Sequence, residues 1–168
     1  FLFILLKVDY YNPLVQGIIR AVDLPSQFLR SLIKPVKNFD FSSFLVAVFI
    51  QAGAFYLAAI AGSIEYEPIK ILMWSTYSVV LLMLKMIWWI LLGGIILSFI
   101  AGNNYHPAIV LIRQMSDKFF NPFRTFLPPM GGLDFSPIFA FIVLNFLQAI
   151  SVQYALESGL PVWLSVGF

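Results

Sequence analysis

Cysteine is absent from this sequence, and charged residues are scarce. The lack of thiols excludes disulfide bonds, thiolate metal sites and cysteine nucleophiles. Charged residues make up 11% of the chain, whereas a soluble domain carries about 25%. Ten basic and eight acidic residues are too evenly balanced to predict nucleic-acid binding. Phosphate loops, nucleophile elbows and zinc motifs are also missing, so we expect no enzyme activity, no cofactor and no metal.

Apolar residues dominate instead, at 61% of the chain with a mean hydropathy of +0.91. Residues 41–64 carry no charge over 24 positions, residues 71–100 carry only Lys85, and residues 135–156 carry none. A membrane-spanning helix needs about 20 such residues, so each run predicts one span. We interpret residues 1–6 as the end of a first span whose beginning is missing. The sequence thus predicts an all-α membrane protein with four transmembrane helices.

The stretches between the spans, residues 7–37 and residues 101–133, are amphipathic connectors. Each begins a helix with a polar residue followed by proline, and these polar residues are Asn12 and His106. We expect His106 to cap its helix. Apolar residues then recur on one helical face, which predicts two short helices per connector lying in the membrane interface. Packing against a soluble domain is the less favoured alternative, because the chain has no such domain.

The two connectors are copies of one pattern. Residues 11–42 and residues 105–136 align without a gap and agree at nine of 32 positions. An ungapped match that keeps prolines and charges of both signs indicates an internal repeat. Two units follow, residues 1–64 and residues 65–168, each with a span, a connector and a second span. Because two spans separate the connectors, the units are parallel repeats related by an axis along the membrane normal.

Three charged residues recur at the same places in both copies: Asp23, Arg30 and Asp40 in the first, and Asp117, Arg124 and Asp134 in the second. The structural interpretation is that each aspartate caps a helix and each arginine pairs with an aspartate or with phosphate headgroups. The functional interpretation is a binding surface for a cytoplasmic partner. Repetition alone does not separate the two.

A turn rich in proline and glycine leads into the last span. Pro128 and Pro129 end the preceding helix, and we expect Gly131 or Gly132 to adopt a positive φ between the two helices. Asp134 then caps the helix that forms the last span.

Lysine and arginine are unevenly distributed between the two membrane faces. The connectors carry eight of them, whereas the opposite face carries only Lys70, beside acidic residues. The positive-inside rule therefore predicts that both connectors are cytoplasmic.

Lys85 is the candidate site inside the apolar runs. It lies 15 residues into the third run, about 22 Å along a helix axis. A lysine near mid-bilayer costs at least about 2.5 kcal/mol unless it faces protein, water or a partner. We expect it to face the bundle interior and contact Gln51, Asn145 or Gln148. The spans contain no carboxylate, so fastening of helices is favoured over an ion, proton or lipid site.

These motifs resemble those of the YggT family, called YlmG in Gram-positive bacteria and plastids. The family pattern has an F-Y-N-P start, a D-P-L-L-R-P-R-R stretch and P-P-M-G-G-L-D-F-S-P, which are similar to residues 10–13, 117–124 and 128–137 here. The first copy departs from the pattern, because Asn38 and Phe39 replace Gly-Leu. The resemblance implies a small multi-pass protein of a bacterial inner membrane or, alternatively, of a plastid membrane.

For function, the resemblance implies links to osmotic-stress tolerance and ion uptake, to cell division and nucleoid distribution, and to cytochrome assembly in plastids. A large amphipathic surface without a convergent polar site favours an accessory, scaffold or assembly role in a membrane complex. The alternative is a component of an ion or osmolyte transport system, which needs a water-accessible path with several polar groups. Besides the bilayer, we expect other membrane proteins or further copies of the chain as partners.

Overall fold

The computed structural model describes residues 2–32, 40–62, 64, 67–100, 102, 105–126 and 134–160, without the side chains of residues 24–26, 28–30 and 32. Within these residues the chain is all-helical. The helices are α1 (Leu2–Leu5), α2 (Pro13–Leu32), α3 (Phe41–Ile60), α4 (Pro68–Ile100), α5 (Pro107–Phe126) and α6 (Ser136–Glu157).

Three of these helices, α3, α4 and α6, are long and apolar enough to cross a membrane. α3 begins at Phe41 as predicted, α4 begins three residues earlier than predicted, and α6 begins one residue later. The prediction of an all-helical, membrane-type protein is therefore confirmed. α1 covers only four residues, so the fourth span and the division into two repeats stay predictions.

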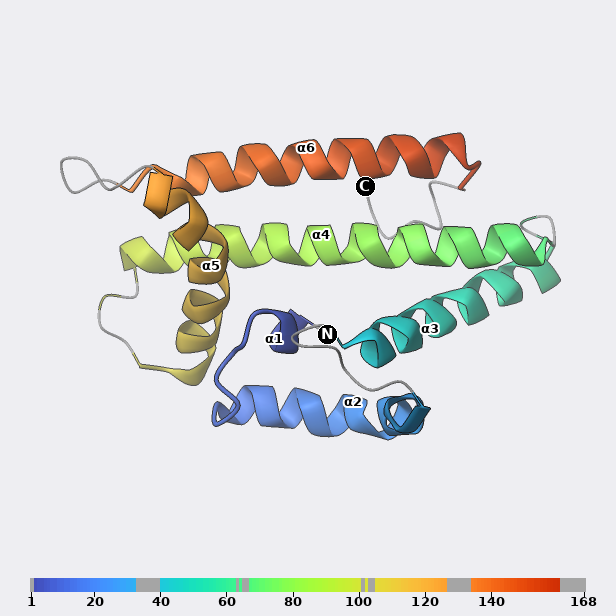
Figure 1. Cartoon of the computed structure of the whole chain (residues 1–168), viewed down its shortest axis with the longest axis horizontal. Helices are drawn as coiled ribbons and strands as arrows, with labels where there is room; N and C mark the ends of the chain where they lie inside the picture. Colours follow the sequence, from blue (N-terminus) through green and yellow to red (C-terminus); the bar gives the residue numbers. More distant parts are fainter. Residues whose placement is uncertain are drawn as a thin grey trace.

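α4 is the central helix of the structure. It contains 33 residues, about 50 Å at 1.5 Å per residue. It packs against α3, α5 and α6, and Figure 1 shows α6 running antiparallel beside it. α5 lies across α4 and the start of α6, as an interfacial helix would, whereas the first part of α2 runs along α4 in this view (Figure 1). The interfacial location of α2 and α5 stays a prediction.

In the described part of each connector the chain forms one continuous 20-residue helix, which corrects the expectation that a second short helix starts within residues 13–32 and 107–126. α2 continues through Pro25, and α5 continues through Pro122. A proline removes one backbone hydrogen bond and bends a helix, but the next turns can resume the helical path. Figure 1 shows the last turns of both helices turning away from the direction of their first turns.

Polar side chains mark the starts of three helices. The Asn12 Oδ1 atom accepts a hydrogen bond from the Leu14 backbone N–H at 3.0 Å, and His106 Nδ1 accepts one from Ala108 at 3.3 Å. Asp40 caps α3, because its carboxylate accepts hydrogen bonds from the backbone N–H of Ser43 at 3.3 Å and from its hydroxyl. These contacts satisfy backbone donors that the first helical turn leaves open. The predicted helix start after Asn12 and the predicted capping by His106 are confirmed.

The end of α6 is anchored to the start of α4. Gly159 adopts a φ of +77°, and the Leu160 N–H donates to the Ala155 carbonyl, which together form a Schellman-type helix end. Leu160 packs into an apolar cluster that includes Trp74 of α4. The Trp74 indole Nε1–H donates to the Ser158 carbonyl at 3.0 Å.

A second apolar cluster joins the opposite part of α4 to its neighbours. Leu91 of α4 packs with Met115 and Phe120 of α5 and with Ala140 and Leu144 of α6. α6 is therefore held against α4 near both of its ends, and the residues between these contacts form the candidate site.

Candidate functional site

The polar residues of α4 and α6 meet in a cleft between these two helices. Lys85 of α4 lines this cleft together with Asn145 and Gln148 of α6, and the cleft has a volume of about 420 Å³. The remaining lining residues are apolar or aromatic: Leu81, Trp88, Trp89, Ala149 and Val152. We refer to it below as the Lys85 cleft.

Helical spacing explains why these side chains meet. Trp88 and Trp89 follow Lys85 by three and four residues on α4, and Gln148 follows Asn145 by three residues on α6. Residues at these spacings share one face of a helix. α4 and α6 lie side by side and antiparallel (Figure 1). The face of α4 that carries Lys85 and the two tryptophans therefore meets the face of α6 that carries Asn145 and Gln148.

The Lys85 cleft lies near the middle of the longest helix. Lys85 follows Pro68 by 17 residues and precedes Ile100 by 15, about 25 Å and 22 Å along the helix axis. Lys85 and Gln148 are half-buried, and Asn145 is exposed. The cleft therefore opens on the surface of the described residues. Polar groups at this depth of a membrane are unfavourable when they face lipid, so the cleft is a candidate binding site.

Aromatic rings form the wall of the Lys85 cleft. Trp88 makes edge-to-face contacts with Phe141 of α6, at 5.6 Å between ring centroids, and with Trp89 at 5.1 Å. These contacts hold Trp88 in place. Trp89 is 59% exposed and lies at the rim. The sequence analysis did not single out either tryptophan, although their spacing from Lys85 was the signal that would have found them.

Gln51 does not line the Lys85 cleft. It is half-buried on α3, and the cleft is made by α4 and α6 alone. Of the three polar residues named as neighbours of Lys85, the structure thus brings two, Asn145 and Gln148, to the same cleft. A hydrogen bond from Lys85 to either of them stays a prediction.

A network of ion pairs joins α5 to the start of α6. Arg124 Nη1 lies 2.8 Å from the Asp117 carboxylate, and Arg124 Nε lies 2.7 Å from the Asp134 carboxylate. Nη1 also donates to the side-chain oxygen of Asn121 at 3.1 Å, and the guanidinium lies 5.7 Å from the centre of the Phe120 ring. The pairing predicted for Arg124 is present, and it uses both Asp117 and Asp134.

The ion pairs of this network favour the charged forms of Arg124 and Asp134. Burial alone would raise the pKa of Asp134, but hydrogen bonds from Ser136 and Arg124 and the charge of Arg124 lower that pKa below its ordinary value. Burial alone would likewise lower the pKa of Arg124, and the carboxylates of Asp134 and Asp117 raise it instead. The network is therefore charged at neutral pH, which suits a structural link between two helices.

The four recurring aspartates do not share one role. Asp40 caps α3 as predicted. The prediction that Asp134 is the cap of α6 is corrected, because the N-cap is Phe135; Asp134 lies one residue earlier, and its carboxylate accepts a hydrogen bond from the Ser136 N–H at 2.9 Å. Asp23 and Asp117 lie inside α2 and α5, so the expectation that they cap helices is corrected. The reason is that each connector forms one continuous helix, which has no second start at these positions.

Several predicted residues lie outside the described part of the chain. The side chain of Arg30 is among those not described, and so are Gly131 and Gly132 with the rest of the predicted turn. The pairing of Arg30 and the positive φ at one of these glycines stay predictions.

The two connectors contact each other, which the sequence analysis did not anticipate. The Asn12 Nδ2–H donates to the Pro107 carbonyl at 2.8 Å, and the Asp9 N–H donates to the Gln114 side chain at 3.2 Å. The starts of α2 and α5 are therefore joined directly. No local sequence pattern marks these contacts, because they connect residues about a hundred positions apart.

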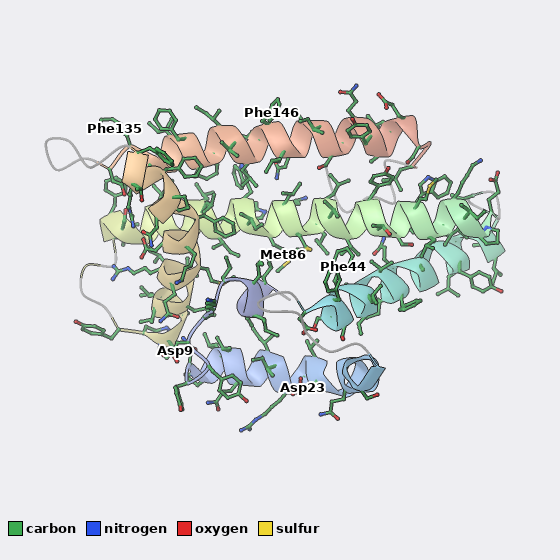
Figure 2. The ribbon with its side chains drawn as sticks, in the orientation of Figure 1. Asp9, Asp23, Phe44, Met86, Phe135 and Phe146 are labelled. Carbon is green, nitrogen blue, oxygen red and sulfur yellow. The ribbon has the colours of Figure 1, made fainter. Side chains whose placement is uncertain are left out.

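A separate, largely apolar cavity of about 360 Å³ lies between α1, α2, α3 and α4, and Met115 of α5 also lines it. Phe44 and Met86 line it, and Figure 2 shows both in the space between α3 and α4. Asp23 and Ser43 are the polar residues among its lining.

These features define a class: small all-helical proteins with membrane-type spans, amphipathic connector helices and a polar cleft between two spans. The family model CCB3/YggT matches residues 73–155. The uncharacterized protein PA0392 of Pseudomonas aeruginosa is 34% identical over 173 residues, which cover 99% of this chain and 86% of the relative. YggT of Escherichia coli K12 is 30% identical over 140 residues, 81% of this chain and 70% of the relative.

A chloroplastic protein is similar over a shorter stretch. YlmG homolog protein 2 of Arabidopsis thaliana is 58% identical over 40 residues, 23% of this chain and 16% of the relative. No solved structure matches. The chain belongs to the CCB3/YggT family, and the resemblance in its motifs is confirmed.

Proposed function

We propose that this chain is a non-enzymatic accessory or assembly protein that binds another membrane protein within the bilayer. The Lys85 cleft is the observation that supports this role. It presents a cation and two amides on the surface of two span-like helices, at a depth where polar groups favour contact with protein over lipid. Elsewhere these helices expose side chains that suit lipid, such as Phe146 on the side of α6 away from α4 (Figure 2).

The proposal includes a membrane arrangement. We propose four spans in two parallel repeats, with both connectors in the cytoplasm of a bacterial cell and the spans in its inner membrane. The nine identities between the connectors and their eight basic residues support it. A plastid membrane is the alternative.

Affinity purification tests the accessory role. The tagged chain is purified in mild detergent, and bound proteins are identified by mass spectrometry for wild type, Lys85→Met and Lys118→Met. Lys118 is exposed on α5 and does not line the cleft, so it is the matched control. We expect a membrane protein that is retained by wild type and Lys118→Met and lost by Lys85→Met. The absence of any specifically bound membrane protein with wild type would contradict the role.

Transport of an ion or osmolyte is the second candidate function. A lysine at mid-span beside a cavity favours it, since transport sites use ionisable groups at this depth. A transport path also needs further polar groups, and the Lys85 cleft offers Asn145 and Gln148. A Lys85→Met variant that keeps its bound proteins but fails in an osmotic or ion-flux assay would favour transport.

A further inference from the structure

We infer that the apolar cavity between α1, α2, α3 and α4 binds one acyl chain of a membrane phospholipid. This cavity is separate from the Lys85 cleft and shares no lining residue with it, so the site goes beyond the proposed function. The lining, the shape and the opening of the cavity each support this ligand.

The lining of the apolar cavity suits hydrocarbon. Fourteen of its 16 lining residues are apolar, and three of them are methionines, out of five in the whole chain. These are Met83, Met86 and Met115. Methionine side chains are flexible and polarisable, so they adapt to apolar ligands of variable shape. Of the two polar lining residues, Asp23 and Ser43, the Ser43 hydroxyl already donates to Asp40 at the cap of α3. A polar ligand needs several polar groups that converge on it, so the lining favours an apolar one.

Hydrocarbon also suits the apolar cavity better than water does. A buried water molecule needs about two to four polar partners, and apolar cavities stay dry. A space of about 360 Å³ without an occupant would leave the atoms of its lining without dispersion contacts. Lipid hydrocarbon surrounds the spans of a membrane protein, and it is therefore the material at hand to fill the space.

The shape of the apolar cavity separates a single chain from a helix. On α4 its lining runs from Val79 to Ile90, about 16 Å along the helix axis, and the first part of α2 runs along α4 in Figure 1. Over this length, 360 Å³ corresponds to a mean cross-section of roughly 22 Å². A helix about 10–12 Å in diameter would need roughly 80–110 Å². A hydrocarbon chain that contacts its neighbours at about 4.5 Å needs roughly 20 Å².

The length fits an acyl chain as well. The acyl chains of one leaflet fill half of the hydrocarbon core, about 15 Å. The lining on α4 extends over about the same distance, so one such chain occupies the cavity from end to end.

The apolar cavity opens on an apolar surface. Leu82 and Met86 of α4 line it and are also exposed, and so are Ile18 and Val22 of α2. A phospholipid can therefore insert one chain sideways while its second chain and its headgroup stay in the bilayer. Because α2 and α4 both line the cavity, the bound chain packs the first connector helix against the spans.

Lipid analysis of the purified protein tests the occupancy. The tagged full chain is extracted from membranes in mild detergent and washed with excess detergent, which removes lipid that only surrounds the spans. Phospholipid, free fatty acid and detergent are then quantified per chain by mass spectrometry for wild type, Ala47→Phe and Ala54→Phe. Ala47 lines the cavity, so the new ring would occupy it. Ala54 is exposed on the same helix and does not line the cavity, so it is the matched control.

Photolabelling of the wild-type chain locates the lipid and does not depend on how a variant folds. The protein is placed in vesicles of phosphatidylethanolamine and phosphatidylglycerol that contain a phosphatidylethanolamine with a diazirine in one acyl chain. After the same detergent wash, light releases N₂ from the diazirine, and the carbene inserts into a neighbouring bond. Labelled residues are identified by mass spectrometry.

We expect wild type and Ala54→Phe to retain phospholipid, and Ala47→Phe to retain about tenfold less, which corresponds to about 1.4 kcal/mol of binding free energy. The labels on wild type should lie on lining residues such as Met83 and Met115, and not on Phe146, which is exposed on α6.

Other outcomes overturn the inference. Wild type without phospholipid, or with free fatty acid or detergent in its place, shows that a phospholipid chain is not the occupant. Equal phospholipid in folded Ala47→Phe, or labels confined to exposed residues such as Phe146, shows that the lipid binds the outer surface instead. None of these results bears on the accessory role, which depends on the Lys85 cleft.

Discussion

The close approach of α5 to α4 depends on the glycine at position 94. A Cβ atom built on Gly94 would lie closer than 3.0 Å to both the Oγ and the Cβ of Ser116 on α5. The next nearest atom, in the Phe120 ring, would be at an ordinary 3.7 Å. Both Gly94 and Ser116 are buried, so the overlap cannot be relieved by moving a flexible side-chain end into solvent. Gly94→Ala therefore has to move α5 away from α4.

Two opposing terms set the size of this effect. Overpacking a tightly packed interface typically costs about 1–3 kcal/mol. Replacing glycine by alanine inside a helix stabilises the folded state by about 0.5–1 kcal/mol, because the unfolded chain then has less conformational freedom to lose on folding. The expected net loss for Gly94→Ala is on the order of 1 kcal/mol. For a chain of this size, that corresponds to a melting temperature lowered by about 2–4 °C.

Thermal unfolding in mild detergent, followed by tryptophan fluorescence, measures the loss. Gly53→Ala is the matched control, because a Cβ at Gly53 in α3 would meet no atom within 4 Å. That variant should melt at or slightly above the wild-type temperature. Adding Ser116→Gly to Gly94→Ala removes both close contacts, so the double variant should melt higher than the sum of the two single effects predicts. If Gly94→Ala melts like Gly53→Ala, the helices do not approach as closely as described here.

Three further predictions concern the ion pairs and the topology. Arg124→Lys keeps the charge but cannot bond Asp117 and Asp134 from separate nitrogens, so it should lower stability by about 0.5–1 kcal/mol in the same melting assay; an unchanged melting temperature would show that one contact suffices. The folded-state pKa of Asp134 is lowered from 3.8, so its stabilising contribution is present above that value and is lost as the pH falls through the folded pKa. Asp134→Asn should therefore lose less stability than wild type on acidification below about pH 4, and equal losses would contradict the ion pair. In this cysteine-free chain, Ala21→Cys and Lys118→Cys should react with a membrane-impermeant thiol reagent only from the cytoplasmic side, and labelling from outside at either position would reverse the proposed topology.

The helices themselves could be predicted from composition and from a few cap residues. The boundary at Phe41 follows from Asp40, and the start of α6 follows from Asp134 and Pro137, because these residues act on neighbouring backbone groups. The continuity of α2 and α5 could not be predicted in this way. A proline inside a helix either ends it or bends it, and tertiary packing rather than local sequence decides between these outcomes.

The candidate site could be predicted only in part. Hydropathy marks Lys85 as unusual, and depth along the helices points to Asn145 and Gln148 as neighbours. Depth points equally to Gln51, but α3 and α6 pack on different sides of α4 (Figure 1), so Gln51 lies away from the cleft. The side of α4 that each helix covers follows from packing in apolar clusters, such as the one that contains Leu91 and Leu144, residues more than fifty positions apart.

The register in which α6 packs along α4 determines which side chains line the Lys85 cleft. At one end, Arg124 joins α5 to Asp134 at the start of α6, and at the other end Trp74 of α4 binds the Ser158 carbonyl. A shift of α6 by one residue would move its side chains by about 1.5 Å along the axis and turn them by about 100°, so Gln148 would no longer lie in the cleft with Lys85. Contacts far from the cleft thus determine which polar groups it presents, and a protein that recognises Lys85 together with both amides recognises this register.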